Sequence, residues 1–396
     1  MKKKVIWLIL SCLITASLLL TSCGPKAEPT PTKELPKMIG LTTFGSGSKG
    51  YVLHTGMAHA IEKMSGIKVR VVPGGSGKAR TMAVLRGECL LGANLENAFY
   101  GQQGGIWDFL EEGPQRLAMA WLGAPGSATI YCRADSGIKT FEDIKGKRVV
   151  DLEKFDISTH KMLVAFLSYG GIKWPDDVIR VPLTYMEAKI APLEGTADVS
   201  SCTPAADYAY ALDSSIHGAY LFQFPAENEE GWKRLRAEAP VYAPGPITNG
   251  VGATDENPII VPTYPYALIT RPDADEELVY TVTKAIIDGY DLYKDAHPES
   301  KLWTLDNCLK MTMLNATGLP FHPGTVRALK ETGKWTERHD KWQQSRLDFA
   351  DQIDKAYSET VNEAADKVIS IGSAKFQEMW LPKWEKMRAD LTLIQY

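Results

Sequence analysis

The most constraining feature of this chain is a regular alternation of strand and helix signals separated by glycine-rich turns. The apolar run Met38–Thr43 is followed by such a turn and then by Tyr51–Met64, whose apolar residues have helical spacing. The β-branched run Ile67–Val72 also ends in a glycine-rich turn and precedes a short helical stretch, Ala79–Leu85. Because the same alternation resumes at Thr129, the sequence predicts two α/β blocks of similar size.

The later elements follow from the same reasoning. Strands are predicted at Thr129–Arg133, Arg148–Leu152, Ile179–Leu183, Ala197–Ser201 and Ala219–Phe224, and helices at Ser158–Tyr169, Met186–Glu194 and Glu276–Tyr293. We expect a first lobe in residues 38–128, a second lobe in 129–262, a return to the first lobe in 263–336, and a helical C-terminal extension in 337–396.

The C-terminal extension is rich in charge but carries one apolar stripe. The stripe consists of Ala350, Ile353, Tyr357, Val361, Ala364 and Val368. We expect it to pack against the body of the protein, and docking of a membrane partner is the alternative. Gly372 and Pro382 are expected to interrupt the helix.

The N-terminus has the pattern of a secretory signal. Three lysines precede the apolar run Val5–Leu20, and small residues then lead to Cys23. This arrangement resembles the lipobox of bacterial lipoproteins, which implies removal of residues 1–22 and acylation of the Cys23 thiol. An ordinary signal or a membrane anchor is the alternative. Two or three acyl chains would hold a folded domain at the membrane without a spanning helix.

The segment after the signal has the composition of a tether. Residues 23–37 contain four prolines, scattered charge and few apolar side chains, so we expect them to stay extended. The folded part should begin near Met38. The sequence therefore predicts an extracytoplasmic protein that is lipid-anchored to the cell membrane.

Length and charge exclude several classes of protein. About 360 residues follow the tether, which is more than one hydrophobic core usually organises. Loss of the three signal lysines would change the formal net charge from −4 to −7. Such an acidic body argues against a nucleic-acid partner.

Four cysteines remain in the body after the signal and Cys23 are set aside. They are Cys89, Cys132, Cys202 and Cys308, and none belongs to a CxxC pair. Two disulfides are compatible with an oxidising compartment. Their apolar surroundings favour four buried free thiols instead.

The loop Gly45–Gly50 fits the pattern G-x-G-x-x-G between a strand and a helix. A dinucleotide site would also need an acidic residue at the end of the next strand, where Val72-Pro73 stands instead. We therefore favour a cradle for a carboxylate or phosphate, formed by backbone N–H groups and hydroxyls without an arginine. A tight turn without a ligand is the alternative.

Polar residues follow the ends of several predicted strands, where open α/β sheets bind ligands. Hydroxyls and amides would orient a solute, loop N–H groups would neutralise its charge, and aromatic rings would cover its carbon skeleton. Ser158 and Thr159 have plain helix capping as an alternative role. The candidate ligand-binding residues are Thr43, Ser46, Ser48, Tyr51, Ser76, Asn94, Asn97, Ser158, Thr159, Thr203 and Tyr264.

Motifs of catalysis and metal binding are missing from the sequence. It contains no GxSxG, no HExxH, no cysteine cluster and no EF-hand loop. His54 and His59 are five residues apart on one predicted helix, which does not place them on one face. We therefore predict that the protein is not an enzyme and has no cofactor or metal site.

The assembled pattern resembles an extracytoplasmic solute-binding protein, and more narrowly the TAXI family that serves sodium-coupled TRAP transporters. The resemblance rests on the glycine-rich loop with Tyr51, on Gly74-Gly75-Ser76, on Arg133–Arg148 and on Leu319–Gly333, which contains His-Pro-Gly. It implies a two-lobed type II periplasmic-binding-protein fold with a central cleft. It also implies that a small organic acid, glutamate-like or a dicarboxylate, is passed to a membrane permease.

The sequence departs from this family after Val150. Where a segment rich in glycine and serine is expected, it carries Asp151, Glu153 and Asp156. Their charges would repel a second carboxylate on the solute or would accept an amine. The alternatives are a binding protein of an ATP-driven importer for sulfonates or pyrimidine precursors, a surface enzyme, and a ligand sensor that acts through a membrane partner.

Overall fold

The first sheet combines early strands of the chain with one that returns much later. The computed structural model describes residues 34–95, 101, 103–123, 125–239, 241–313 and 318–392. Its first sheet has the order β2 (Lys68–Pro73), β1 (Met38–Thr43), β3 (Leu91–Leu95), β13 (Tyr266–Thr270) and β4 (Ala118–Leu122). β1 is parallel to β2 and β3, whereas β13 is antiparallel to β3 and β4.

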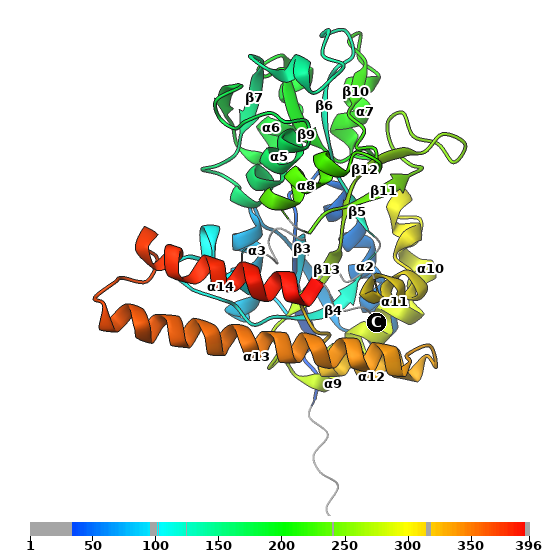
Figure 1. Cartoon of the computed structure of the whole chain (residues 1–396). Coiled ribbons are helices and arrows are strands. Elements are labelled where there is room, and N and C mark those ends of the chain that lie inside the picture. The colour runs from blue at the N-terminus through cyan, green and yellow to red at the C-terminus, as the bar shows by residue number, and fades with distance from the viewer. Residues whose placement is uncertain are drawn as a thin grey trace, which may run out of the picture. The chain divides into compact units, whose positions relative to one another are not determined.

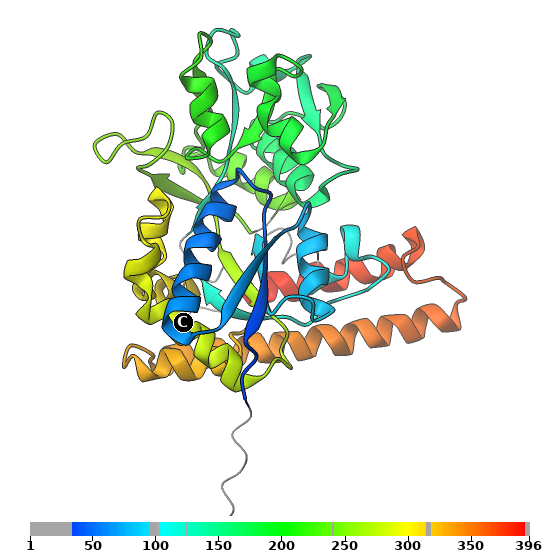
Figure 2. The same cartoon turned by 180° about the vertical axis from the view of Figure 1, so that it is seen from behind.

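The second sheet is formed entirely by the middle of the chain. Its order is β10 (Ala219–Leu221), β6 (Thr129–Arg133), β9 (Val199–Cys202), β7 (Arg148–Asp151) and β8 (Ile179–Pro182). β7 is parallel to β8 and β9, and β6 is antiparallel to β9 and β10. We call the two sheets with their helices lobe I and lobe II (Figures 1 and 2). The predicted two-lobed α/β fold class is confirmed.

A third, small sheet links the strands that cross between the lobes, and the sequence did not predict it. Its order is β11 (Ala243–Ile247), β12 (Ile259–Tyr264) and β5 (Gly126–Ser127), with antiparallel pairing. β11 contains Pro244 and Pro246. Prolines are tolerated at a sheet edge, but in the sequence they have the pattern of a turn. The predicted lobe boundary at 128/129 falls between β5 and β6, and the one at 262/263 falls within β12.

The helices predicted at Tyr51–Met64, Ala79–Leu85, Ser158–Tyr169 and Met186–Glu194 are present with ends within two residues of the prediction, whereas the predicted helix Glu276–Tyr293 is divided in two. Together with further helices that were not assigned a range from the sequence, they cover the sheets. They are α2 (Lys49–Ser65), α3 (Gly77–Leu85), α5 (Ile157–Tyr169), α6 (Tyr185–Glu194), α7 (Asp207–Asp213), α8 (Glu229–Glu238), α9 (Glu276–Asp288), α10 (Tyr290–Tyr293), α11 (Leu305–Met313) and α12 (Pro323–Glu331), with short 3₁₀ turns η1 (Trp107–Phe109), η2 (Glu142–Ile144) and η3 (Pro298–Leu302).

The C-terminal extension forms two helices, α13 (Glu337–Asp366) and α14 (Ala374–Thr392), which lie side by side (Figure 1). Ile353 and Ala364 of the predicted stripe are buried in the core. Val368 is instead 94% exposed, because the helix has ended and the chain turns there. Gly372 separates the helices as predicted, whereas Pro382 lies inside α14.

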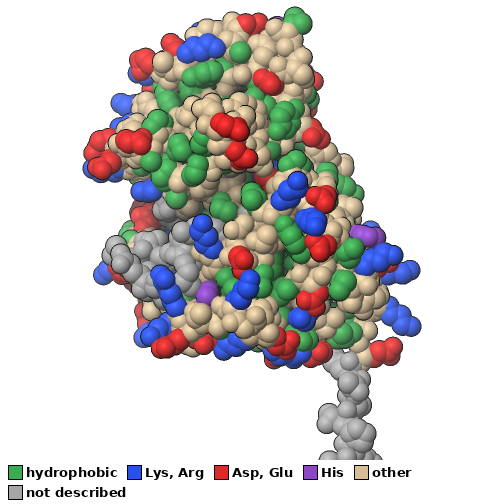
Figure 3. Space-filling model, turned by 90° about the vertical axis from the view of Figure 1, so that its right-hand side faces the viewer, with side chains coloured by type: hydrophobic (Ala, Val, Ile, Leu, Met, Phe, Trp, Pro, Cys, Tyr) green, Lys and Arg blue, Asp and Glu red, His purple; other side chains and the backbone are tan. Residues whose placement is uncertain are grey.

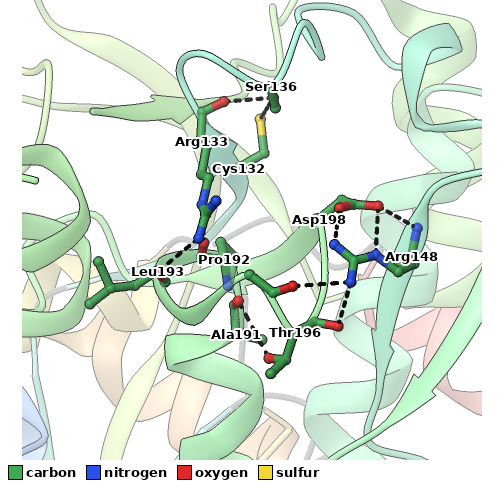
Figure 4. A network of polar contacts seen from close by, with 10 residues as sticks. Cys132, Arg133, Ser136, Arg148, Ala191, Pro192, Leu193, Thr196 and Asp198 are labelled. Carbon is green, nitrogen blue, oxygen red and sulfur yellow. Dashed lines mark hydrogen bonds and ion pairs between the residues drawn. The ribbon is translucent and has the colours of Figure 1, made fainter. Parts of the chain in front are cut away.

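Two arginines complete the C-terminal end of α6 in lobe II (Figure 4). Arg133 donates to the carbonyl oxygens of Pro192 and Leu193 at 2.6 and 2.9 Å. Arg148 donates to neighbouring carbonyls and forms an ion pair with Asp198 at 2.6 Å. The guanidinium groups satisfy carbonyls that have no partner within the helix and complement its dipole.

All four body cysteines are free and buried, so the preference for thiols is confirmed. In the part of the chain that the structure describes, no helix has the length and apolar character needed to cross a membrane. The predicted signal, Cys23 and most of the tether lie outside the described residues.

Candidate functional site

The loop between β1 and α2 is built as a helix start. Ser48 caps α2: its Oγ donates to the Gly45 carbonyl at 2.8 Å and accepts from the Tyr51 N–H at 3.2 Å. Thr43 is fully buried, and its hydroxyl lies 2.6 Å from His54 Nδ1. Burial lowers the pKa of His54 to about 3, so its ring is neutral. These contacts shape the loop and leave Ser46 exposed at its tip.

The loop after β2 has a similar start but adds a charge. Ser76 caps α3 by accepting from the Ala79 N–H at 3.1 Å. One turn later, Arg80 lies on the buried face of α3 and is only 4% exposed. The helix therefore brings a guanidinium group to the end of the sheet, next to Phe44 at the start of the loop for which the sequence predicted a cradle without an arginine.

Arg80 is held by neutral groups. Its Nε donates to the Ala93 carbonyl at 2.9 Å, and its Nη1 donates to the Gly74 carbonyl at 3.2 Å. Its Cζ lies 3.9 Å from the centre of the Phe44 ring, a cation–π contact. Burial lowers the pKa of Arg80, and no acidic side chain among the described residues lies within ion-pair distance. Three of its five N–H donors are left for an anion.

Side chains from both lobes act electrostatically on Arg80. Burial lowers the pKa of Arg80, whereas the Asp156 carboxylate of lobe II raises it most strongly, followed by Tyr266 and Tyr185. Asp156 is 7% exposed and caps α5 by accepting from the Thr159 N–H at 3.1 Å. The site therefore has a cation on lobe I and a carboxylate on lobe II.

Tyr266 supplies a free hydroxyl beside this charge. The ring is buried between His54 and Trp303, with centroid distances of 5.5 and 5.0 Å. Its hydroxyl is buried and has no hydrogen-bond partner in the described structure. A Cβ at Gly50 would lie 2.7 Å from this hydroxyl, so the last glycine of the loop is required by close packing. An unpaired buried hydroxyl is costly, which points to a ligand or water as its partner.

A second cation, Lys189 of α6, lies in lobe II. It is 2% exposed, and its Nζ donates to the Ser201 carbonyl and hydroxyl at 3.0 and 2.7 Å. Its Nζ also lies 5.1 Å from the centre of the Tyr185 ring. Burial lowers the pKa of Lys189 to about 8, while Cys202 and Asp156 act in the opposite direction.

Lys189 should make stability depend on pH above neutrality. An unfolded lysine titrates near 10.4. Between pH 8 and about 10 the unfolded chain therefore binds one proton more at this position than the folded protein does. Because of this difference, raising the pH stabilises the fold. We expect the unfolding free energy of the unmodified protein, relative to that of Lys189→Met, to rise by about 1 kcal/mol per pH unit in this range. Urea denaturation at pH 8, 9 and 10 measures it. A constant difference would contradict the lowered pKa.

The predicted binding residues divide into several groups. Ser48 and Ser76 act as helix caps. The N–H of Thr159 donates a hydrogen bond to Asp156, which caps α5. Asn94 is buried and donates to the Thr81 hydroxyl at 2.8 Å. The Thr203 N–H donates to the hydroxyl of Tyr208 at 3.1 Å. Tyr51 and Ser158 are half-buried, and Asn97 lies outside the described residues.

Tyr264 is buried but does not contribute to the Arg80 site as described. Its ring packs edge-on against Tyr242 with centroids 5.9 Å apart. It lines a separate pocket of about 950 Å³ between the small sheet and the segment from Asp295 to Leu302. β11, β12 and α10 mark this side at the right of Figure 1, and Figure 3 turns it toward the viewer.

Three residues of the candidate site, Arg80, Tyr266 and Lys189, were not predicted from the sequence. One signal for Arg80 was present, since it lies four residues after the helix cap Ser76 and three and four residues from the apolar Ala83 and Val84. Of the three flagged acids, Asp156 alone acts on Arg80, while Asp151 and Glu153 pair with Arg180.

A family model described as the NMT1-like family matches residues 41–333. The chain belongs to the NMT1-like family. No curated protein matches the sequence. This NMT1-like chain is similar to the alkanesulfonate-binding protein SsuA of Xanthomonas axonopodis pv. citri bound to MOPS, with 18% identity, coverage of 80% of this chain and 92% of that chain, and a TM-score of 0.43.

Two further solved structures are similar to this NMT1-like protein. The periplasmic aliphatic sulphonate-binding protein SsuA of Escherichia coli has 17% identity, coverage of 83% of this chain and 89% of that chain, and a TM-score of 0.42. An ancestral arginine-binding protein bound to arginine has 16% identity, coverage of 68% and 97%, and a TM-score of 0.39.

Proposed function

We propose that this NMT1-like protein is an extracytoplasmic solute receptor that binds a small organic anion beside Arg80 and delivers it to a membrane permease. The observation that carries the proposal is the buried Arg80 guanidinium, which has carbonyl partners but no ion pair among the described residues. A buried cation without an anion is unfavourable. A carboxylate or sulfonate would supply the missing charge through short, charge-assisted hydrogen bonds.

The acidic side chain of Asp156 favours a solute that also carries an amine. Asp156 is buried opposite Arg80. Its carboxylate would repel the second negative charge of a simple dianion. A glutamate-like amino acid offers an ammonium group to Asp156 and a carboxylate to Arg80.

Matched solutes that differ by one ammonium group test this proposal. We expect L-glutamate to bind the purified protein at least about tenfold more tightly than glutarate, because a hydrogen bond to a charged group contributes about 1.5–3 kcal/mol. Isothermal titration calorimetry gives both affinities, and taurine with ethanesulfonate forms a second pair. Equal binding within each pair would exclude amine recognition but keep the anion receptor. Binding by none of the four would contradict this choice of solute class.

The permease partner is proposed to be a sodium-coupled TRAP transporter, and this rests on the sequence resemblance to the TAXI family. An ATP-driven importer is the alternative. Uptake of the bound solute by intact cells distinguishes them, because collapse of the sodium gradient at constant ATP should stop uptake through a TRAP transporter. Uptake that persists without the gradient would favour the ATP-driven importer. The lipid anchor at Cys23 is part of the same proposal, since it would keep the receptor near its permease.

A further inference from the structure

A compact group of metal-ligating side chains lies at the end of β7, outside the Arg80 site. Asp151, Glu153 and His160 each offer one ligand atom, and these atoms lie within 4.8 Å of one another. Asp151 ends the strand, Glu153 follows in the turn, and His160 comes from the first turns of α5. Asp151 and His160 are buried, whereas Glu153 is exposed.

The imidazole of His160 is directed into this group without a partner of its own. His160 is 3% exposed, and its Nδ1 is buried and makes no hydrogen bond in the described structure, although it lies 3.2 Å from Asp151 Oδ1. The ring packs against Trp174 in an edge-to-face arrangement, with centroids 5.1 Å apart. An imidazole nitrogen that donates no hydrogen bond can offer its lone pair to a metal ion.

Arg180 supplies the positive charge of the group. Its Nε lies 2.8 Å from Asp151 Oδ2, and its Nη2 lies 2.8 Å from Glu153 Oε2. The Arg180 side chain is 40% exposed, and its Cζ lies 5.7 Å from the centre of the Trp174 ring. The guanidinium can therefore leave the carboxylates for solvent while it keeps its aromatic contact.

We propose that Asp151, Glu153 and His160 form a binding site for a divalent transition-metal ion, with Zn²⁺ as the best match. One imidazole nitrogen and two carboxylate oxygens are ligands that zinc accepts, with water completing a tetrahedral set. The two carboxylates balance the charge of the ion, and Arg180 competes with it for the same oxygens. The bound ion would link the end of β7 to α5 and so restrict the motion of the turn that leads to Asp156.

Titration of the purified protein with ZnCl₂, followed by calorimetry, and with CoCl₂, followed by visible absorption, tests the site. Glu153→Gln removes one ligand at an exposed position and is expected to weaken zinc binding at least about tenfold. Arg180→Met removes the competing cation and is expected to strengthen it. Glu142→Gln, an exposed acid elsewhere on lobe II, is the matched control and should bind as the unmodified protein does.

Zinc binding that is weakened by Glu153→Gln and strengthened by Arg180→Met supports the site. Zinc binding that Glu153→Gln leaves unchanged places the ion elsewhere and overturns the proposal. Failure of both the unmodified protein and Arg180→Met to bind zinc overturns it as well. Because these experiments use no organic solute, their outcome is independent of the proposed receptor function.

Discussion

Replacing Arg80 with methionine is expected to weaken solute binding by about 100-fold or more. The variant keeps an apolar chain of similar length over the Phe44 ring but removes the guanidinium, whose distance to that ring centre is 3.9 Å in the present structure. A paired hydrogen bond between an arginine and a carboxylate is among the stronger interactions in proteins. Its loss from a water-excluded site should cost on the order of 3 kcal/mol, which corresponds to about 100-fold in affinity.

Calorimetry with whichever solute binds the unmodified protein measures this effect, and circular dichroism checks the fold of the variant. Arg86→Met is the matched control, because Arg86 is the exposed C-terminal cap of the same helix. We expect its affinity to be unchanged. If Arg80→Met binds the solute as tightly as Arg86→Met does, the anion does not lie at Arg80 and the proposed site is wrong.

Replacing Trp380 with alanine is expected to destabilise the protein by about 3–5 kcal/mol. Trp380 of α14 is fully buried, donates its indole N–H to the Gly104 carbonyl, and packs against Tyr357 with centroids 5.0 Å apart. Alanine would leave a large cavity and an unpaired carbonyl. The extension would therefore be part of the core and not an appended partner-binding arm.

Urea denaturation measures the change, with Glu378→Ala on the exposed side of α14 as its control. We expect Glu378→Ala to stay within about 0.5 kcal/mol of the unmodified protein. A loss below about 1 kcal/mol for Trp380→Ala would show that α14 unfolds independently of the body. If Trp380→Ala then kept its fold but abolished solute uptake by cells, the result would favour the alternative, in which the extension binds a partner.

The elements of the fold were largely predictable because they depend on local sequence. Strand β1 was predicted at Met38–Thr43 and lies there, and α5 begins one residue before its predicted start at Ser158. Apolar periodicity and glycine turns act over a few residues. The small sheet escaped prediction because the pairing of β11 with β12 is a tertiary contact and its prolines have the pattern of a turn.

The candidate site was predicted less completely because side-chain direction is decided by packing. Thr43 was predicted to face a ligand but bonds to His54 inside the core. Tyr264 was chosen on the crossover, whereas the free hydroxyl belongs to Tyr266. The two tyrosines are two positions apart in the sequence, and only the tertiary packing places the hydroxyl of Tyr266 beside Arg80.

By itself, the sequence determined the α/β alternation and the glycine-rich turns at the strand ends. These follow from backbone geometry and from hydrogen bonds between residues a few positions apart. Only the tertiary structure decided that Arg80 of lobe I acts on Asp156 of lobe II, 76 positions later in the chain. The distance between these two charges depends on how the strands that cross between the lobes place the two sheets. No local sequence pattern encodes that placement.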